Sequence, residues 1–530
     1  MGEKWRVLVS EPVAQEGLEI LRAHDDIEVI FKPDLKPDAL PQEVAEAHGL
    51  IVRSQTKVTA PVIEAGKKLR VIARAGVGVD NIDVPAATRR GIVVLNSPDG
   101  NTIAAAEQTI ALLLALSRSL PQAHASLSAG EWKRSAFMGV EVYGKVLGLI
   151  GLGKVGTHVA RMARGLEMEI IACDPYISRE HAERLGVRLV GFEELLRQAD
   201  YISVHVSLTE DTRHMIGAKE LAMVKPGMRI INTSRGAVID EAALAEAIRS
   251  GGVAGAALDV FENEPPKGSP VIGLPGVVTT PHLGAATEEA QVKVAVDVAA
   301  QLADVLHGLP ARTAVNLPPV SAETLKALRP YLTLAEKIGA LQAQLAQGAV
   351  TSIEVTYSGE IAELDVSTVT RALLKGLLER ALEESVNYVN ATFVAETRGI
   401  RVTEAKSTSA EDYASLIAVG ASSESGSREI EGTVFGAQDI RITRIDGYRV
   451  DFVPQGNLLI TTNQDRPGMI GRVGTILGDA GLNIAGMYVG RDKPGGREVM
   501  VLAVDCPVPA AVCEKVSRVD GIESIHLAEL

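Results

Sequence analysis

The sequence predicts an α/β protein with two doubly wound parallel-sheet domains, followed by two smaller α+β domains of which the last is ferredoxin-like. Short apolar runs alternate with helical stretches from Trp5 to about His307, which is typical of parallel sheets covered by helices. A second series of such runs begins at Lys145 with an apolar run into a glycine-rich turn. A proline-rich break at residues 314–320, which we predict to be a linker, then precedes a different order of elements, which indicates that other folds follow.

Composition limits the classes of function. A chain of 530 residues and 56.0 kDa is long enough for about three or four domains. The formal net charge of -14 argues against a nucleic acid or an anionic membrane as partner, because such binding needs a basic face. The three cysteines form no C-x-x-C or zinc pattern, and no other pattern indicates a metal site. So few cysteines, and no apolar signal core at the N-terminus, predict a cytoplasmic protein.

The elements follow in this order. Residues 1–98 carry strand-like runs such as R-V-L-V-S, G-L-I-V-R-S and I-V-V-L-N, and a long Ala/Leu-rich helix begins near Asn101. The second α/β series continues to residue 284, and a helix covers residues 285–307. Beyond the break, residues 321–453 mix helices near 322–347 and 368–384 with alternating strands and a polar turn at 422–428. Residues 456–530 read strand, helix, strand, strand, helix, strand, which is a split βαβ module.

The glycine-rich turn matches a dinucleotide-binding fingerprint. Gly151, Gly153 and Gly156 follow an apolar strand and open a helix, and Asp174 ends the next strand 18 positions after Gly156. The glycines permit a tight turn and close approach of a pyrophosphate to the helix N-terminus. Asp174 is placed to bind ribose hydroxyls and to repel a 2′-phosphate, which favours NAD over NADP. A glycine-rich turn in a sheet that binds no nucleotide is the structural alternative.

Three polar side chains are predicted at strand ends beside this turn. Arg235 follows I-I-N-T-S, Glu264 follows A-A-L-D-V-F, and His282 follows G-V-V-T-T, so a parallel sheet gathers them at one edge. Histidine can accept the proton that oxidation of an alcohol releases, a carboxylate can orient the imidazole, and arginine can bind a substrate carboxylate. Each residue taken alone is more often structural, but the combination indicates a 2-hydroxy acid dehydrogenase.

Several ordered motifs resemble those of the D-isomer-specific 2-hydroxyacid dehydrogenase family over residues 1 to about 317. They are A-R-A-G-V-G-V-D-N-I-D, G-L-G-K-V-G, C-D-P-Y, N-T-S-R-G, L-D-V-F-E-N-E-P and T-P-H-L-G-A-A-T. The resemblance implies that Arg235 binds substrate, that Glu264 is the partner of the histidine, and that His282 is the acid/base. Glu264 argues against the formate dehydrogenase branch, where a glutamine stands. The resemblance also implies cofactor contacts from Lys154, Val155, Thr233, Asp259 and Gly284.

The substrate half carries two arginines at strand ends. Arg53 and Arg74 suit a phosphate if the first sheet is also open, although an ordinary pair of loop arginines is the alternative. In the branch of the family that oxidises D-3-phosphoglycerate, the matching arginines hold the distal phosphate, and we add Ser54 and Gly76 to this predicted pocket. Residues 132–134, W-K-R, resemble a loop that reaches a neighbouring subunit's active site.

The domains beyond the catalytic part narrow the branch. I-T-T-N-Q-D-R-P-G-M-I-G resembles the start of an ACT domain, a module that senses small molecules. The resemblance implies a substrate-binding domain (1–98 and 285–317), an NAD-binding domain (99–284), an intervening regulatory domain (318–454) and an ACT domain (455–530). It implies NAD-dependent oxidation of D-3-phosphoglycerate to 3-phosphohydroxypyruvate, the first committed step of L-serine synthesis.

Regulation and assembly follow from the same resemblance. L-serine is the expected effector, held between two ACT domains by Asp465 and Asn483, although Asn463 replaces a tyrosine found in some relatives. An ACT domain that serves only oligomerisation is the alternative. We expect a homo-oligomer, with a tetramer as the favoured size. Two other functions stay open: reduction of unphosphorylated hydroxypyruvate or glyoxylate, and a non-catalytic NAD-sensing scaffold.

Overall fold

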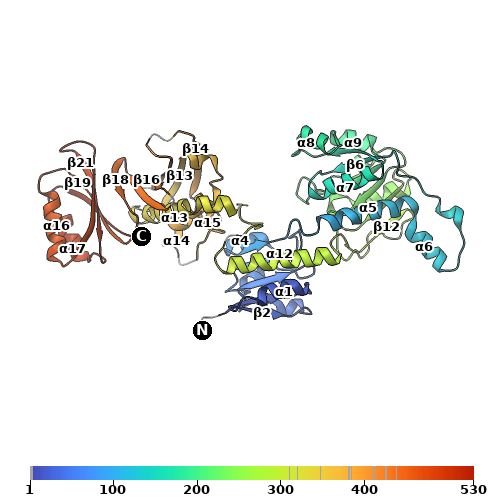
Figure 1. The fold of residues 1–530 in the computed structure, drawn as a ribbon, viewed down its shortest axis with the longest axis horizontal. Helices are drawn as coiled ribbons and strands as arrows, with labels where there is room; N and C mark the ends of the chain where they lie inside the picture. Colours follow the sequence, from blue (N-terminus) through green and yellow to red (C-terminus); the bar gives the residue numbers. More distant parts are fainter. Residues whose placement is uncertain are drawn as a thin grey trace.

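The computed structural model describes residues 4–309, 311–318, 320, 322–346, 348–379, 382, 385–409, 412–423, 426–436 and 438–530. These described residues form four β-sheets with helices packed against them. Figure 1 shows an elongated molecule in which the first sheet lies between the second and the third, and the fourth sheet lies at one end. The predicted fold class is confirmed: two parallel α/β sheets precede two α+β units.

The first sheet is parallel, in the order β2-β1-β3-β4-β5. Its strands are β1 (Trp5–Val9), β2 (Ile27–Phe31), β3 (Gly49–Val52), β4 (Val71–Arg74) and β5 (Val93–Leu95). The helices are α1 (Gln15–Arg22), α2 (Leu40–Val44), α3 (Ala60–Ala65), α4 (Val84–Arg89) and the short η1 (Pro37–Ala39). Helix α12 (Glu288–Leu306) returns from the second sheet, and its buried Val298 and Leu302 pack with Leu18 and Leu21 of α1. The first sheet is therefore completed by a distant part of the chain.

The second sheet is also parallel, in the order β12-β11-β10-β9-β6-β7-β8, with the doubly wound topology of dinucleotide-binding folds. Its strands are β6 (Val146–Ile150), β7 (Glu169–Cys173), β8 (Arg188–Leu189), β9 (Tyr201–Val204), β10 (Arg229–Asn232), β11 (Gly255–Leu258) and β12 (Val277–Thr279). Its helices are α5 (Thr102–Arg118), α6 (Leu120–Ser128), η2 (Arg134–Phe137), α7 (Lys154–Gly165), α8 (Arg179–Arg184), α9 (Phe192–Gln198), α10 (Ala218–Leu221), η3 (Gly236–Val238) and α11 (Glu241–Arg249). The strand order reverses between β6 and β9. In such sheets a dinucleotide binds at the carboxyl ends of the strands beside this reversal, which is where the glycine-rich turn after β6 lies.

The third sheet is mixed, in the order β14-β13-β15-β16-β17-β18: β13 and β14 pair in parallel, and the other neighbouring strands pair antiparallel. Its strands are β13 (Val350–Gly359), β14 (Arg401–Ser407), β15 (Ser415–Ser423), β16 (Gly426–Phe435), β17 (Asp439–Ile445) and β18 (Tyr448–Phe452). Helices α13 (Ala322–Leu345), η4 (Glu360–Glu363), α14 (Ser367–Glu379) and α15 (Ala391–Thr397) accompany it. Asn387 donates to the carbonyl of Gly91 at 2.8 Å, so this domain contacts the end of α4.

The fourth sheet is antiparallel, in the order β20-β21-β19-β22. It consists of β19 (Asn457–Gln464), β20 (Ile484–Arg491), β21 (Arg497–Val504) and β22 (Ile522–Glu529), with α16 (Met469–Asp479) and α17 (Ala510–Ser517). Leu458, Val499 and Val501 belong to the same buried cluster as Ile445 and Phe452 of the third sheet. The third and fourth sheets therefore share a core.

The structure differs from the sequence prediction at the proline-rich break. Ala314 pairs with Leu95 in an isolated bridge, and Asn316 accepts a hydrogen bond from the backbone of Val94 at 2.9 Å. Residues 314–316 therefore belong to the first sheet and are not a linker, because the free edge of β5 has backbone groups to pair. Some residues of the predicted break, helices and turn lie outside the described residues: Pro319, Gln347, Arg380, Ala381, Glu383, Glu384, Glu424 and Ser425.

Within the described part of the chain, no single helix is long and apolar enough to cross a membrane. Helices α5 and α6 taken together have the length and apolar composition of a membrane span, but their axes are bent by 63°. Helix α5 packs inside the second domain, with Leu112, Leu113 and Leu116 buried in its core.

Two helical glycines allow α13 and α14 to cross closely. A Cβ built on Gly376 lies 2.0 Å from the carbonyl oxygen of Glu336, and one on Gly339 lies 2.0 Å from that of Leu373. Because both obstacles are backbone, Gly376→Ala is expected to separate the helices and to destabilise the domain by about 1–3 kcal/mol. Chemical denaturation of the full chain measures this loss. Gly471→Ala on α16, where a Cβ meets nothing within 4 Å, is the control and should not destabilise.

Candidate active site

Three adjacent strands bring the predicted reacting groups to one edge of the second sheet. Strand β11 lies between β10 and β12, with Asn232 opposite Leu258 and Leu258 opposite Thr279. The loops that follow these strands carry Arg235, Glu264 and His282. The structure therefore brings together, at the carboxyl edge, side chains that are up to 47 positions apart in sequence.

His282 and Glu264 form a hydrogen-bonded pair. Nδ1 of His282 lies 2.8 Å from Oε2 of Glu264, and Oε1 of Glu264 accepts the backbone N–H of Phe261 at 3.2 Å. Partial burial acts to raise the pKa of Glu264, but its hydrogen bond to His282, with charges on His282 and Arg235, holds that pKa below the ordinary value. The carboxylate therefore stays ionised until the pH falls below its usual range. With Nδ1 donating to this carboxylate, Nε2 is left to exchange a proton with substrate.

Hydrogen bonds to the carboxylate of Asp259 fix the loop that carries His282. This carboxylate is fully buried and accepts hydrogen bonds from the Thr280 hydroxyl at 2.6 Å and from the N–H groups of Leu283 and Gly284 at 2.7 and 2.8 Å. His282 itself has a positive φ of 55° and donates its N–H to the carbonyl of Asp259 at 2.9 Å. A left-handed conformation is unusual for a residue other than glycine, so the loop is held by these bonds.

Arg235 reaches from the second sheet to the first. Its Nε donates to Oδ2 of Asp80 at 2.8 Å, and its Nη1 donates to the carbonyl of Ser234 at 2.8 Å. A Cβ at Gly78 would lie only 1.7 Å from Nη2 of Arg235. The guanidinium therefore occupies space that only a glycine leaves open, and it spans the gap between the two domains.

Arg74 and Arg53 lie at the ends of the paired strands β4 and β3. Asn81 joins them: it accepts from Nε of Arg74 at 3.2 Å and donates to the carbonyl of Arg53 at 2.8 Å. Burial lowers the pKa of Arg74 to about 10, with a second contribution from the charge of Arg235. The carboxylates of Asp80 and Glu11 offset part of this effect, and a further anion beside Arg74 would stabilise its charged form. The cluster is thus suited to an anionic ligand.

The glycine-rich turn has the geometry that a dinucleotide requires. Gly151 has a φ of +94°, and a Cβ on Gly156 would lie 2.3 Å from the Gly151 carbonyl oxygen, whereas a Cβ on Gly153 would meet nothing within 4 Å. Asp174 accepts hydrogen bonds from the N–H groups of Leu152 and Tyr176, both at 2.8 Å. The carboxylate thus lies beside the turn, and the open space at Gly153 fits a pyrophosphate at the start of α7.

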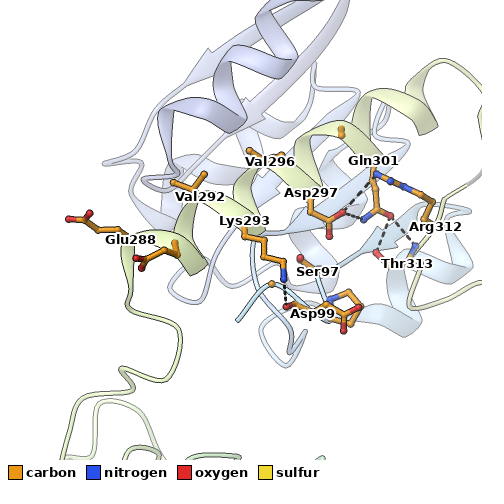
Figure 2. Close-up of a pocket in the computed structure, with 14 residues that line it drawn as sticks. Ser97, Asp99, Glu288, Val292, Lys293, Val296, Asp297, Gln301, Arg312 and Thr313 are labelled. Atoms are coloured by element: carbon orange, nitrogen blue, oxygen red, sulfur yellow. Dashed lines mark hydrogen bonds and ion pairs between the residues drawn. The ribbon is translucent and has the colours of Figure 1, made fainter. Parts of the chain in front are cut away.

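A cavity of about 900 Å³ lies elsewhere, between residues 97–100 and α12. Figure 2 shows Lys293 of α12 pointing to Asp99, whose carbonyl accepts from it at 3.1 Å. The carboxylate of Asp99 pairs with Lys154, the first residue of α7. The segments that connect the first two sheets line this cavity, and Arg235, Glu264 and His282 are not among its described lining residues. Lys154, which we predicted to contact the cofactor, thus forms an ion pair with the segment that connects the first sheet to α5.

The remaining predicted cofactor and substrate residues are positioned as follows. The Thr233 hydroxyl lies 2.7 Å from that of Thr109 on α5. Val155 packs partly buried on the core of the second domain. Ser54 is exposed in the loop after β3, and a Cβ at Gly76 would lie 2.4 Å from Nη1 of Arg74.

The two predicted effector residues lie apart within one chain. Strands β19 and β20 both pair with β21. Asp465 follows the last residue of β19, which pairs with Arg497 at the start of β21. Asn483 precedes the first residue of β20, which pairs with Val504 at the end of β21. These are opposite ends of the sheet, roughly 20 Å apart at about 3.3 Å per residue. Asn463 is buried and donates to Glu498. A ligand held by both Asp465 and Asn483 therefore needs two chains.

Sequence reasoning missed four residues that position the predicted groups. They are Glu11, Gly78, Asp80 and Asn81. Glu11 is buried and accepts the N–H groups of Arg53 and Thr56 at 2.9 and 2.8 Å. Three of the four lie in the motif A-R-A-G-V-G-V-D-N-I-D, and its paired glycines were a signal that bulky groups come close to this loop.

Fold and site together define an oxidoreductase that uses a dinucleotide. Residues 110–284 match the family model described as D-isomer specific 2-hydroxyacid dehydrogenase, NAD binding domain. Residues 327–446 match the D-3-phosphoglycerate dehydrogenase intervening domain, and residues 457–521 match the ACT domain. The protein is thus an NAD-dependent dehydrogenase of the D-2-hydroxyacid class that carries a domain of the effector-binding type.

Full-length relatives identify the branch. The chain is 47% identical over 528 residues to D-3-phosphoglycerate dehydrogenase of Archaeoglobus fulgidus, covering 99% of this chain and 100% of the relative. It is 41% identical to that of Bacillus subtilis, covering 99% and 100%. A solved glyoxylate reductase from Paecilomyes thermophila is 32% identical, with a TM-score of 0.55 over 59% of this chain and 99% of that one. The chain belongs to the D-3-phosphoglycerate dehydrogenase family.

Proposed function

We propose that the enzyme oxidises the C2 hydroxyl of D-3-phosphoglycerate to give 3-phosphohydroxypyruvate, the entry step to L-serine. The observation that carries this proposal is the cationic cluster of Arg53, Arg74 and Arg235. A substrate with a carboxylate at one end and a phosphate at the other can neutralise it at both ends. The full-length relatives from Archaeoglobus fulgidus and Bacillus subtilis, both D-3-phosphoglycerate dehydrogenases, support the same substrate.

His282 acts as the general acid/base. When bound beside the glycine-rich turn, NAD supplies the acceptor for the hydride that leaves C2. The proton of the C2 hydroxyl passes to Nε2 of His282 as the C–O bond becomes a carbonyl. Glu264, bonded to Nδ1 at 2.8 Å, stabilises the imidazolium that results. Because the Glu264 carboxylate stays ionised, it can do this at neutral pH.

Substrate orientation goes to the arginines. Arg235 binds the C1 carboxylate and polarises the developing C2 carbonyl, since Asp80 and Ser234 fix its guanidinium close enough to Glu264 to lower the pKa of that carboxyl. Arg74 and Arg53 hold the phosphate, with Ser54 and Gly76 completing the pocket. Polar groups at both ends place C2 between the histidine and the cofactor site.

Phosphate preference tests the substrate. We expect NADH oxidation to be faster with 3-phosphohydroxypyruvate than with hydroxypyruvate, and Arg74→Leu to lower kcat/KM for the phosphorylated acid by about 10- to 100-fold, since a hydrogen bond to a charged group contributes about 1.5–3 kcal/mol. The same variant should change hydroxypyruvate turnover little. Arg184→Leu, on exposed α8, is the control. Equal rates on both acids would favour the unphosphorylated substrates, and absence of any turnover would favour the NAD-sensing scaffold.

Cofactor choice tests Asp174. Replacing Asp174 with alanine removes the carboxylate that repels a 2′-phosphate and that orders Leu152 and Tyr176. We expect KM for NADH to rise and the NADPH-to-NADH ratio of kcat/KM to increase at least tenfold. Initial rates with both cofactors measure that ratio. A ratio unchanged from wild type would mean that Asp174 only fixes the turn.

We further propose a cytoplasmic homo-oligomer, most simply a tetramer. Helix α6 contains no buried residue, Leu120 and Leu127 on it are 54% and 58% exposed, and Trp132 is 78% exposed. Such a patch suits a second subunit. Since Asp465 and Asn483 lie at opposite ends of one sheet, an L-serine site formed by both also needs paired ACT domains.

A further inference from the structure

A group of metal-binding side chains lies on the first domain, outside the groups assigned above. His24 and Asp26 lie in the turn between α1 and β2, and His307 follows the last residue of α12. One ligand atom from each residue lies within 4.8 Å of the other two. Asp26 and His307 are 281 positions apart in sequence, which is why no local pattern indicates this cluster.

The cluster is already ordered by contacts among its members. Nε2 of His307 lies 2.9 Å from Oδ2 of Asp26, and the rings of His24 and His307 are 5.1 Å apart between centroids. Ligand atoms around a tetrahedral zinc ion are about 3.3 Å apart when each bond is about 2.0–2.1 Å. Small side-chain rotations therefore suffice to direct three ligand atoms at one ion.

The backbone on both sides is fixed. The carbonyl of His24 accepts the N–H of Ile27 at 3.1 Å, and the carbonyl of Asp26 accepts the N–H of Trp5 at 2.8 Å. His307 donates its N–H to the carbonyl of Ala303 at 3.0 Å. The cluster thus joins a turn that is tied to β1 with the C-terminus of a long helix, where the helix dipole favours a cation.

We propose that His24, Asp26 and His307 bind a divalent transition-metal ion of the Zn²⁺ type. Two imidazoles and one carboxylate are ligands that zinc, nickel and copper prefer, whereas magnesium and calcium prefer all-oxygen sites. Because Asp26 and His307 are exposed, water completes the coordination. The ion links α1 to the end of α12, from which the chain continues toward the intervening domain, and it therefore stabilises the first domain.

Titration of the full-length, tag-free protein with Zn²⁺ tests this site. Isothermal titration calorimetry of the wild-type protein should show one Zn²⁺ site of this kind per chain. His307→Asn and Asp26→Asn should each raise the Kd for Zn²⁺ at least tenfold. Zn²⁺ should also raise the thermal unfolding temperature of wild type but not of these variants. Both variants should keep wild-type dehydrogenase activity in the absence of Zn²⁺, which shows that they fold.

Two control variants separate this site from other histidines. His181→Asn, which changes an exposed residue of α8, and His282→Ala should both bind Zn²⁺ at the His24 cluster with wild-type affinity. The proposal is wrong if His307→Asn and Asp26→Asn bind Zn²⁺ as wild type does. It is also wrong if only His282→Ala removes the binding, because the metal then occupies the active site.

Discussion

Replacing His282 with alanine is expected to lower kcat by about 10²–10⁴-fold in both directions, the range that general acid–base catalysis contributes. The hydroxyl proton then has no acceptor at Nε2, and the keto acid has no donor in the reverse direction. KM should change less, because the arginines still bind the substrate. Stopped-flow or steady-state NADH absorbance with 3-phosphohydroxypyruvate measures the loss.

Two further variants show whether this loss is specific to the proton transfer. His181→Ala on α8 removes an exposed histidine outside the site and should leave kcat unchanged. Glu264→Gln keeps a hydrogen-bond acceptor for Nδ1 but removes the negative charge, so kcat should fall to a value between those of wild type and His282→Ala. A His282→Ala enzyme with wild-type kcat would mean that the histidine only shapes the loop above Asp259.

The sequence could predict those site residues that directly follow a recognisable strand. Arg235, Glu264 and His282 each follow an apolar run, and parallel strands place such residues at one edge. The glycine spacing and Asp174 were also local patterns. These predictions needed only the topology of the sheet, which the alternation of elements indicates.

Contacts between distant segments could not be predicted in this way. The pairing of Arg235 with Asp80 joins two domains across 155 positions, and the pairing of Lys154 with Asp99 joins a helix start to an interdomain connection. Neither follows from periodicity, because both depend on how the two sheets are oriented. The same limit explains why residues 314–316 read as a linker: their partner strand, β5, lies more than 200 positions earlier.

The missed glycine at position 78 provides the second large expected effect. A Cβ there would lie 1.7 Å from Nη2 of Arg235 and 2.9 Å from Oδ2 of Asp80. Both obstacles are the ends of flexible side chains, so Gly78→Ala should displace the guanidinium and leave the fold intact. A displacement of about 1 Å in a positioning group can lower turnover by about 10²-fold. We therefore expect a fall of this order in kcat/KM for phosphorylated and unphosphorylated keto acids alike.

This pattern distinguishes Arg235 from the predicted phosphate ligands. Arg74→Leu should affect mainly the phosphorylated acid, whereas Gly78→Ala should affect both, because every 2-keto acid presents a carboxylate to Arg235. Thermal unfolding should be close to wild type, and Gly165→Ala on α7, where a Cβ meets nothing within 4 Å, should leave kcat/KM unchanged. If Gly78→Ala instead retains wild-type kcat/KM on both acids, the position of Arg235 against Asp80 does not matter for catalysis, and the carboxylate must be bound by another group.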